Sequence, residues 1–287
     1  MSNFINTIKK MEGAYLIAEI GINHNGDIDI AKRLIDATNA CGWHCAKFQK
    51  RNPDVCVPED QKSKMRSTPW GEMTYLEYKY KVEFEKTEYD IINQYCLEKP
   101  LPWTVSIWDI DSLNFISDYD VPFIKIPSPQ ITNHELIKEV ALSGYPVVIS
   151  TGMSTWEIID DALKILDKNN AEYAVLHCNS TYPAPPNELN LNIIPIMKEK
   201  YNCIVGYSGH EYGLEPSVVA VTLGAKIIER HITLDHDMWG TDHKSSLEVH
   251  AMDLLKKRID DINGILGGTE KIITESEKSV MKKLRGK

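Results

Sequence analysis

Short apolar runs alternate with longer amphipathic segments along the whole chain, and this alternation restricts the fold more than any other feature of the sequence. In the first unit, residues 15–20 form an apolar run that ends at Gly21, and Asp27 is a favourable N-cap for a helix over residues 27–41. Seven more strand-like runs follow at residues 45–49, 103–107, 123–126, 147–150, 173–178, 203–207 and 226–232. Helical patterns follow at residues 88–97, 111–118, 134–142, 155–167, 193–200, 214–223 and 247–266.

Eight strand-helix units without a break in composition predict an α/β fold, a single (β/α)8 barrel. The 287 residues form one domain in this interpretation, with residues 1–13 as an N-terminal extension. The alternative is an open doubly wound sheet, which usually carries G-x-G-x-x-G after its first strand. Gly21-Ile22-Asn23-His24-Asn25-Gly26 lacks that spacing, so the barrel is favoured.

One connection is much longer than the others. Residues 51–86 are rich in polar and aromatic residues, among them Trp70, Tyr75 and Tyr78. Long loops in compact domains are usually functional or disordered. Because this one follows a barrel strand, it would lie on the catalytic face. We predict that this loop is a lid over the site or a subunit contact. An equal alternative is that it only packs on a helix.

Composition excludes several classes of protein. The chain has 32 Lys and Arg against 41 Asp and Glu, a net charge of −9, and an acidic chain without a basic block is a poor binder of nucleic acid. No apolar run approaches the roughly 18 to 20 residues of a membrane span. The first residues do not resemble a signal peptide, and the six cysteines contain no CxxC pair. We therefore expect a cytoplasmic, reduced protein without a membrane or nucleic-acid partner.

Polar residues gather where the predicted strands end, which is where barrel enzymes place their reactive groups. Residues two apart in a strand share a face, so Lys47 and Gln49 point inward together, and Glu229 points inward with His231. These strand ends carry Glu19, Lys47, Gln49, Ser106, Lys125, Ser128, Ser208, His210, Glu229 and His231, and the sixth strand continues into Asn179-Ser180-Thr181-Tyr182.

Lys47 and Lys125 predict an anion site. A single lysine at a strand end is usually a surface or salt-bridge residue. Two buried cations at one mouth are costly unless an anion meets them. We therefore expect a ligand with a phosphate or a carboxylate.

His210 and His231 end consecutive strands, so their imidazoles can converge on one ion. Two imidazoles with water and substrate oxygens suit a divalent transition metal such as Mn²⁺, although a structural role is an equal alternative. Glu19 is expected across the mouth, as a general base, a support for the metal or a structural carboxylate. Asp242 lies on the loop after the last strand.

Seven motifs, in order between Ala18 and about Glu248, resemble the sialic acid synthase family. They are Ala18-Glu19-Ile20-Gly21-Ile22-Asn23-His24-Asn25-Gly26, Ala46-Lys47-Phe48-Gln49, Lys125-Ile126-Pro127-Ser128, Leu176-His177-Cys178 leading to Tyr182-Pro183-Ala184-Pro185, Gly206-Tyr207-Ser208-Gly209-His210, Glu229-Arg230-His231 and Gly240-Thr241-Asp242-His243. The resemblance implies a (β/α)8 barrel that condenses phosphoenolpyruvate with an open-chain aldose, such as N-acetylmannosamine. The products would be a nonulosonic acid and phosphate.

The resemblance also implies roles for individual residues. A divalent metal, commonly Mn²⁺ with Mg²⁺ or Co²⁺ as alternatives, would be held by His210 and His231 and would polarise the sugar aldehyde. Glu19 would manage the proton of the attacking water. The phosphoenolpyruvate ligands would be Lys47, Ser106, Lys125, Ser128, Ser180 and Ser208, and the sugar ligands would be Gln49, Tyr182, Glu229 and Asp242. Lys47, Lys125 and Asp242 would also take part in catalysis.

Three departures from the family pattern matter. Ser180 aligns with a phosphate-contacting position, with Asn179 as a rival. Gly209 stands where Asp is common, which predicts weaker metal binding. The chain ends without the family's antifreeze-like domain, as a truncated or a naturally single-domain member. A natural short form predicts an aldose without the N-acyl group. A 3-deoxy-ulosonate synthase and a non-catalytic barrel are the competing interpretations, and a homodimer is the family expectation.

Overall fold

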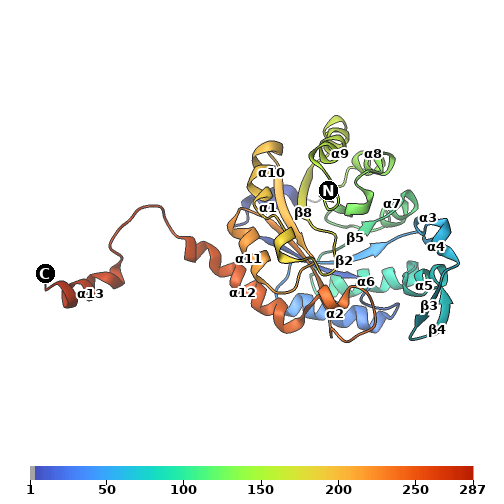
Figure 1. Ribbon diagram of the computed structural model, residues 1–287, viewed down its shortest axis with the longest axis horizontal. Coiled ribbons are helices and arrows are strands. Elements are labelled where there is room, and N and C mark those ends of the chain that lie inside the picture. The colour runs from blue at the N-terminus through green and yellow to red at the C-terminus, as the bar shows by residue number, and fades with distance from the viewer. Residues whose placement is uncertain (1–3, 287) are drawn as a thin grey trace.

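The computed structural model describes residues 4–286 and shows a closed barrel of parallel strands surrounded by helices (Figure 1). The barrel strands are β1 (Tyr15–Gly21), β2 (Cys45–Lys50), β5 (Trp103–Ile107), β6 (Ile124–Ile126), β7 (Val147–Ser150), β8 (Tyr173–Cys178), β9 (Ile204–Gly209) and β10 (Ile227–Thr233). They pair in chain order, and β1 also pairs with β10. This closing pair leaves the barrel without an edge, so the (β/α)8 prediction is confirmed and an open sheet is excluded.

The predicted helices are present, with ends that differ by at most two residues. They are α2 (Ile28–Ala40), α6 (Lys86–Glu98), α7 (Ile110–Ile116), α8 (His134–Leu142), α9 (Trp156–Lys168), α10 (Ile193–Tyr201), α11 (Glu215–Thr222) and α12 (Val249–Leu266), with short 3-10 turns at η1 (Ser128–Gln130), η2 (Pro186–Glu188) and η3 (His243–Ser245). Asp27 caps α2 by accepting hydrogen bonds from the amides of Asp29 and Ile30. The last predicted helix begins two residues late because β11 (Leu247–Glu248) pairs with β10.

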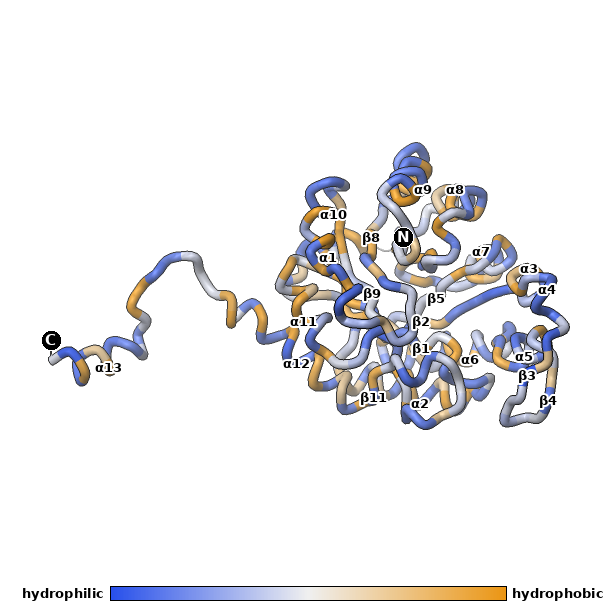
Figure 2. The backbone as a smooth tube through the Cα atoms, viewed as in Figure 1, coloured by the Kyte–Doolittle hydropathy of each residue, from blue (hydrophilic) through white to orange (hydrophobic). Residues whose placement is uncertain are grey.

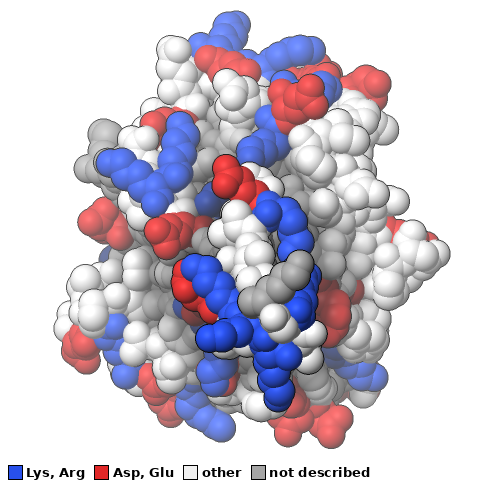
Figure 3. All heavy atoms as spheres, turned by 90° about the vertical axis from the view of Figure 1, so that its left-hand side faces the viewer, with Lys and Arg blue, Asp and Glu red and all other residues white. Residues whose placement is uncertain are grey.

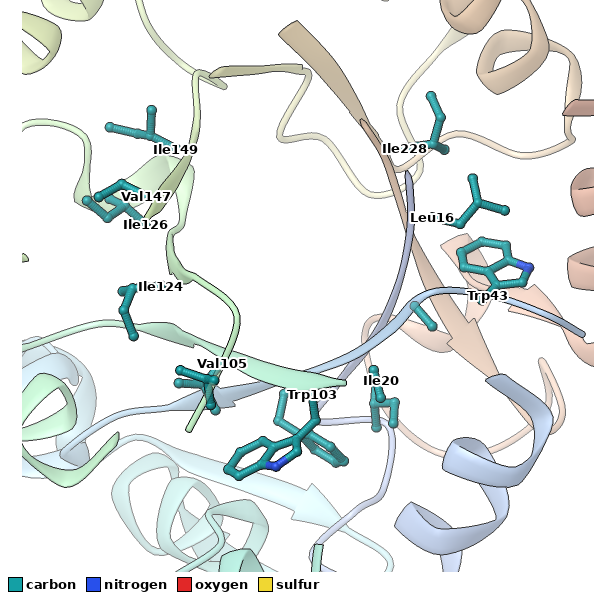
Figure 4. Close-up of a cluster of buried hydrophobic side chains, with 14 of the residues drawn as sticks. Leu16, Ile20, Trp43, Trp103, Val105, Ile124, Ile126, Val147, Ile149 and Ile228 are labelled. Atoms are coloured by element: carbon teal, nitrogen blue, oxygen red, sulfur yellow. The ribbon is translucent and has the colours of Figure 1, made fainter. Parts of the chain in front are cut away.

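Alternation along the strands divides the core into two layers. Outward-facing side chains pack between the strands and the helices and are labelled outside the ring of strands in Figure 4, among them Leu16, Val105 and Ile149. The helices that cover them, such as α8 and α9, show both apolar and polar stretches within each helix in Figure 2. This is the amphipathic pattern of helices with one buried face.

The inward-facing side chains at the N-terminal end of the barrel are apolar. Ile17, Val148 and Leu176 belong to this inner cluster, and α1 (Phe4–Lys10) adds Phe4 and Ile8 to it. The N-terminal extension is therefore a helix that closes the bottom of the barrel, which the sequence pattern did not predict. The polar side chains that line the cavity therefore lie at the C-terminal end of the barrel.

The long connection is folded rather than irregular. We call residues 51–85 the insertion; it contains α3 (Pro53–Cys56), α4 (Glu59–Lys62), the hairpin β3 (Met65–Thr68) and β4 (Gly71–Thr74), and α5 (Tyr75–Val82). Tyr78 packs with Ile22 and Val82, and its ring lies 5.3 Å from the ring of Trp239. The insertion thus joins the loops that follow β1 and β10, at the mouth of the barrel.

The C-terminal segment leaves the barrel after α12 and ends in an exposed helix, α13 (Glu275–Arg285) (Figure 1). Figure 3 faces the side toward which this segment projects, and Lys and Arg side chains gather near the middle of that face. The last turn of α13 carries Lys282, Lys283 and Arg285. Within residues 4–286, no helix is long and apolar enough to cross a bilayer.

Candidate active site

A cavity of about 360 Å³ opens at the C-terminal ends of the barrel strands. The cavity is lined by all the site residues predicted from the sequence: Glu19, Lys47, Gln49, Ser106, Lys125, Ser128, Ser180, Tyr182, Ser208, His210, Glu229, His231 and Asp242. Those on the strands belong to the inward-facing set, directly above the apolar layer. The inward orientation predicted from residues two apart therefore holds for Lys47 and Gln49 and for Glu229 and His231.

Two lysines and two glutamates form a buried network on the floor of the cavity. The Lys47 ammonium pairs with the Glu19 carboxylate and lies 3.6 Å from a carboxylate oxygen of Glu229. The Lys125 Nζ donates to both oxygens of Glu229, each at 2.8 Å. Ser208 Oγ donates to Glu229 at 3.0 Å. Glu19 and Glu229 therefore already neutralise the two lysines. The presence of buried lysines alone does not require an anionic ligand at this site.

The pKa values of the two buried carboxyl groups, Glu19 and Glu229, are shifted in opposite directions. Burial raises the pKa of Glu19, an effect that Lys47 opposes and the charge of Glu229 reinforces. Glu229 is equally buried, yet Lys125 and Lys47 outweigh that burial and hold its pKa at about 2. Two carboxyl groups with pKa values pushed apart are the arrangement that assigns different roles to an acid-base pair. Glu229 keeps its charge, and Glu19 is the group suited to exchanging a proton.

Glu19 lies beside His231 rather than across the mouth from it. The two residues are register partners in the β1–β10 pair, and the Gln49 amide donates to Glu19 Oε1 at 3.1 Å. The expectation that Glu19 faces the histidines from the far side was therefore wrong. Closure of the barrel makes the first strand a neighbour of the last, which brings Glu19 next to His231.

The two histidines converge, with a ring-centroid separation of 5.5 Å. His210 Nδ1 lies 2.6 Å from the Asn179 carbonyl, to which it donates, and Nε2 lies 2.8 Å from the Tyr182 hydroxyl. His231 Nδ1 is buried without a hydrogen-bond partner, 4.0 Å from an Asp242 oxygen. Burial lowers the pKa of His231 to about 3, so this imidazole is neutral.

His231 meets the requirement for a neutral nitrogen donor to a metal. At His210, Cys178 and the Asn179 carbonyl outweigh burial and raise the pKa, so an ion there would compete with a proton. The orphaned Nδ1 of His231 is a buried acceptor that an ion would satisfy. Among residues 4–286, no group of three or more His, Cys, Asp or Glu side chains is arranged to hold an ion. In that part of the chain, His210 and His231 are the two imidazoles that converge at the cavity.

Hydroxyl groups line the opposite side of the cavity, at the ends of β6, β7 and β8. Ser128 Oγ accepts from the Gly152 amide at 2.9 Å, and Ser150 Oγ is buried without a partner. Ser180 lines the cavity, whereas the Asn179 side chain bonds to the Glu188 carbonyl and the Thr181 amide. This favours Ser180 over Asn179 as a ligand. Ser150 was missed by the sequence analysis, although its place at the end of β7 was a sufficient signal.

Although Gly209 replaces the Asp that is common in the family, the carboxylate of Glu211 lies beside it. A Cβ on Gly209 would lie 2.7 Å and 2.8 Å from the two oxygens of Glu211. Glu211 pairs with the fully buried Arg230 at 3.0 Å and accepts a hydrogen bond from Tyr207 at 2.7 Å. Because this carboxylate is engaged with Arg230 rather than with a histidine, the expectation of weaker metal binding stays a prediction.

Comparison with known proteins identifies the family of this chain. The sequence pattern of the NeuB family matches residues 34–271. The chain belongs to the NeuB family. It is 38% identical to an N-acetylneuraminate-9-phosphate synthase of Drosophila melanogaster over 261 residues, which are 90% of this chain and 70% of the relative. It is 34% identical to an N,N'-diacetyllegionaminic acid synthase of Campylobacter jejuni over 272 residues, 93% of this chain and 81% of the relative.

A solved structure agrees with the family assignment. The sialic acid synthetase of Leptospira borgpetersenii, crystallised with citrate, superposes with a TM-score of 0.84 at 30% identity, covering 96% of this chain and 94% of that one. The NeuB-family resemblance expected from the seven motifs is thereby confirmed, together with the barrel fold.

Proposed function

We propose that this NeuB-family chain is a carbon-carbon bond-forming transferase that condenses phosphoenolpyruvate with an open-chain aldose, giving a nonulosonic acid and phosphate. The observation that carries the proposal is the buried network of Glu19, Lys47, Lys125 and Glu229 beside two converging imidazoles. The relatives named above are nonulosonic acid synthases, which favours this reaction over a shorter 3-deoxy-ulosonate synthesis and over a non-catalytic barrel.

Phosphoenolpyruvate would lie between the lysines and the hydroxyl side of the cavity. Lys47 and Lys125 supply charge, and Ser106, Ser128 and Ser180 supply hydroxyl donors. Ser106 accepts from Lys47 at 2.6 Å, which leaves its own proton for an anionic oxygen. The orphaned Ser150 hydroxyl is a further donor at this side. Such preorganised donors stabilise charge that develops during reaction.

The proposed reaction forms a carbon-carbon bond and a carbon-oxygen bond to water, and it breaks the bond between C2 and the bridging oxygen. The enolic carbon of phosphoenolpyruvate attacks the sugar aldehyde, and the aldehyde oxygen takes a proton to become a hydroxyl group. Water then adds to the cationic C2, and Glu19 accepts the proton that this water loses. The bond between C2 and the bridging oxygen then breaks as the C2 hydroxyl becomes the ketone carbonyl, and that oxygen leaves with phosphate, which takes the hydroxyl proton. The two protons of water thus end on the former aldehyde oxygen and on phosphate. The raised pKa of Glu19 supports its role as the proton acceptor.

A divalent ion, Mn²⁺ with Mg²⁺ or Co²⁺ as alternatives, would be held by His210 Nε2 and His231 Nδ1. When bound, it would polarise the aldehyde carbonyl as a Lewis acid. The Tyr182 hydroxyl would release its hydrogen bond to His210 and turn to the substrate. Gln49, Tyr182 and Asp242 are the proposed sugar ligands. Glu229 was predicted among them, but both of its oxygens are bonded to Lys125, so its better role is to position that lysine.

Replacing His210 or His231 by alanine is expected to abolish Mn²⁺ binding and the metal-dependent activity, because each removes one of only two protein donors. Calorimetric titration of Mn²⁺ measures the binding directly, and circular dichroism checks the fold. His236→Ala is the matched control, since His236 pairs with Glu248 outside the cavity. Wild-type Mn²⁺ affinity in both cavity variants would contradict the proposed metal site.

Phosphate release tests the proposed function. Purified protein with Mn²⁺, phosphoenolpyruvate and a panel of mannose-type aldoses should release inorganic phosphate only when an aldose is present. Preference for N-acetylmannosamine would contradict the expectation of a non-acylated substrate. Binding of phosphoenolpyruvate without phosphate release from any aldose would favour a scaffold protein instead.

A further inference from the structure

A fully buried ion pair lies behind the two histidines, outside the cavity. Glu211 and Arg230 are both 0% exposed, and Arg230 Nη1 lies 3.0 Å from Glu211 Oε1. Neither is among the described residues that line the cavity. A buried ion pair contributes little net stability, because removing two charges from water costs about as much free energy as their attraction returns. Its place in the chain shows which geometry this pair fixes instead.

Each partner of the pair adjoins one histidine. Arg230 precedes His231 on β10, and Glu211 follows His210, which comes directly after β9. The pairing of β9 with β10 ends where Arg230 lies opposite Gly209, so His210 stands one residue beyond the last backbone-paired position. Arg230 Nη2 donates to the Glu211 carbonyl at 2.7 Å. The guanidinium thus extends the connection between the two strands to the level of the histidines.

The same guanidinium holds the segment that follows β9. Arg230 Nη1 donates to the Gly213 carbonyl at 3.0 Å and to the Ser217 hydroxyl, on α11, at 3.1 Å. A guanidinium is planar and presents its donors in a fixed fork, so these acceptors are held in one arrangement. Residues 211–217 are therefore anchored to β10 through Arg230.

Hydrogen bonds from the loop after β8 hold the other side of His210. Its Nδ1 donates to the Asn179 carbonyl at 2.6 Å, and its carbonyl accepts from the Ala184 amide at 3.1 Å. These bonds fix His210 relative to β8, whereas His231 belongs to β10. The separation of the two imidazoles, whose ring centroids lie 5.5 Å apart, therefore depends on the bonds of Arg230.

Gly209 leaves the space that the Glu211 carboxylate occupies. A Cβ at position 209 would lie 2.7 Å and 2.8 Å from the two carboxylate oxygens. Ser208 and Glu229 are register partners that bond to each other inside the barrel, so the next pair, Gly209 and Arg230, faces outward. An aspartate at position 209 would place its carboxylate beside Arg230. Glu211 supplies that carboxylate from two residues further along the chain.

We propose that Glu211 and Arg230 are positioning residues that fix the separation of His210 and His231 and thereby set the affinity of the site for a divalent ion. This inference rests on the proposed function, because the two histidines are its proposed ion ligands. Arg230 connects the two strands, and Glu211 holds the guanidinium in the orientation that makes these bonds. Both act on the histidines from outside the cavity.

Binding of Mn²⁺ to the full chain freed of metal, measured by calorimetry, tests the inference without relying on turnover. Glu211→Ala should weaken Mn²⁺ binding about ten- to a hundredfold, the range for residues that support metal ligands. Moving the carboxylate, in the double variant Gly209→Asp with Glu211→Ala, should recover most of the lost affinity. Binding of phosphoenolpyruvate should change little in either variant, because Lys47 and Lys125 lie on β2 and β6.

A neutral variant separates positioning from folding. Glu211→Gln with Arg230→Met leaves neither partner as an unpaired buried charge, so it should fold, as circular dichroism will show. It should still bind Mn²⁺ about ten- to a hundredfold more weakly than the wild type. Glu215→Gln is the matched control, because Glu215 pairs with Arg258 at 3.0 Å on the exposed surface. This control should bind Mn²⁺ as the wild type does.

Wild-type Mn²⁺ affinity in the folded neutral variant would overturn the inference. A relocated carboxylate that recovers none of the affinity would overturn the role given to Glu211. An equal loss of Mn²⁺ and phosphoenolpyruvate binding in Glu211→Ala would assign the pair to general stability instead. A wild-type protein that binds no Mn²⁺ would overturn the metal site and this inference together. Failure of the proposed reaction would appear separately, as absent phosphate release from a protein that binds Mn²⁺.

Discussion

Glu19→Gln is expected to lower kcat by about 10²–10⁴-fold, the usual contribution of a positioned acid-base group. The substitution keeps the size of the side chain and one of the two oxygens that accept from Lys47 and Gln49. It removes the carboxylate of the network in which burial outweighs the lysine and raises the pKa. Initial-rate kinetics should show the loss in kcat, with KM for phosphoenolpyruvate changed only by about a few-fold.

Two comparisons make this result specific. Glu248→Gln makes the same change at the end of β11, outside the cavity, and should retain wild-type turnover. Calorimetry should show that Glu19→Gln still binds phosphoenolpyruvate. If the variant kept kcat within about threefold of the wild type, Glu19 would not be the proton acceptor and the proposed water step would need another base.

Lys125→Met is expected to lower the free energy of unfolding by about 3 kcal/mol, near the lower end of the range for breaking a buried ion pair. The variant leaves Glu229 in the barrel interior with Lys47 as its remaining cation, 3.6 Å away. Lys125 and Lys47 together outweigh burial and hold the pKa of Glu229 at about 2. Without Lys125 the effect of burial raises that pKa, so the variant either keeps a poorly compensated charge or takes up a proton, and both cost free energy. Urea denaturation followed by circular dichroism measures the loss.

Neutralising the partner should restore much of that stability. The double variant Lys125→Met with Glu229→Gln no longer contains an unpaired buried charge, so it should be more stable than Lys125→Met alone. Lys138→Met, on the exposed face of α8, is the control and should change stability by less than about 0.5 kcal/mol. A double variant as unstable as Lys125→Met would mean that the destabilisation comes from lost packing rather than from charge.

The residues on the floor of the site could be predicted because the alternation of side chains along a strand depends only on the local sequence. Inward-facing residues recur every second position in a strand, so Lys47 and Gln49, or Glu229 and His231, can be assigned to the interior without knowing the fold in detail. What spacing cannot give is the partner of each side chain. Lys125 on β6 meets Glu229 on β10, and these strands are not neighbours. The sequence therefore indicated two buried cations but not that the protein neutralises them itself.

The part of the cavity formed by the insertion was not predictable for a different reason. Lys79 of the insertion lines the cavity. Its position depends on how α5 packs, and that packing is fixed by contacts of Tyr78 with Ile22 and Trp239 from distant parts of the chain. No period within residues 51–86 encodes these contacts. The N-terminal helix is similar, since Phe4 and Ile8 become core residues only because a barrel bottom is there to receive them.

The fate of the bridging oxygen of phosphoenolpyruvate tests the proposed reaction most directly. Phosphoenolpyruvate labelled with ¹⁸O between C2 and phosphorus is incubated with the protein, Mn²⁺ and an aldose that supports phosphate release, and both products are analysed by mass spectrometry. The account predicts that the label leaves entirely with inorganic phosphate and that C2 of the nonulosonic acid carries oxygen from water. Label retained at C2, with unlabelled phosphate, would show that the phosphorus-oxygen bond breaks and would contradict the role assigned to Glu19 and its water.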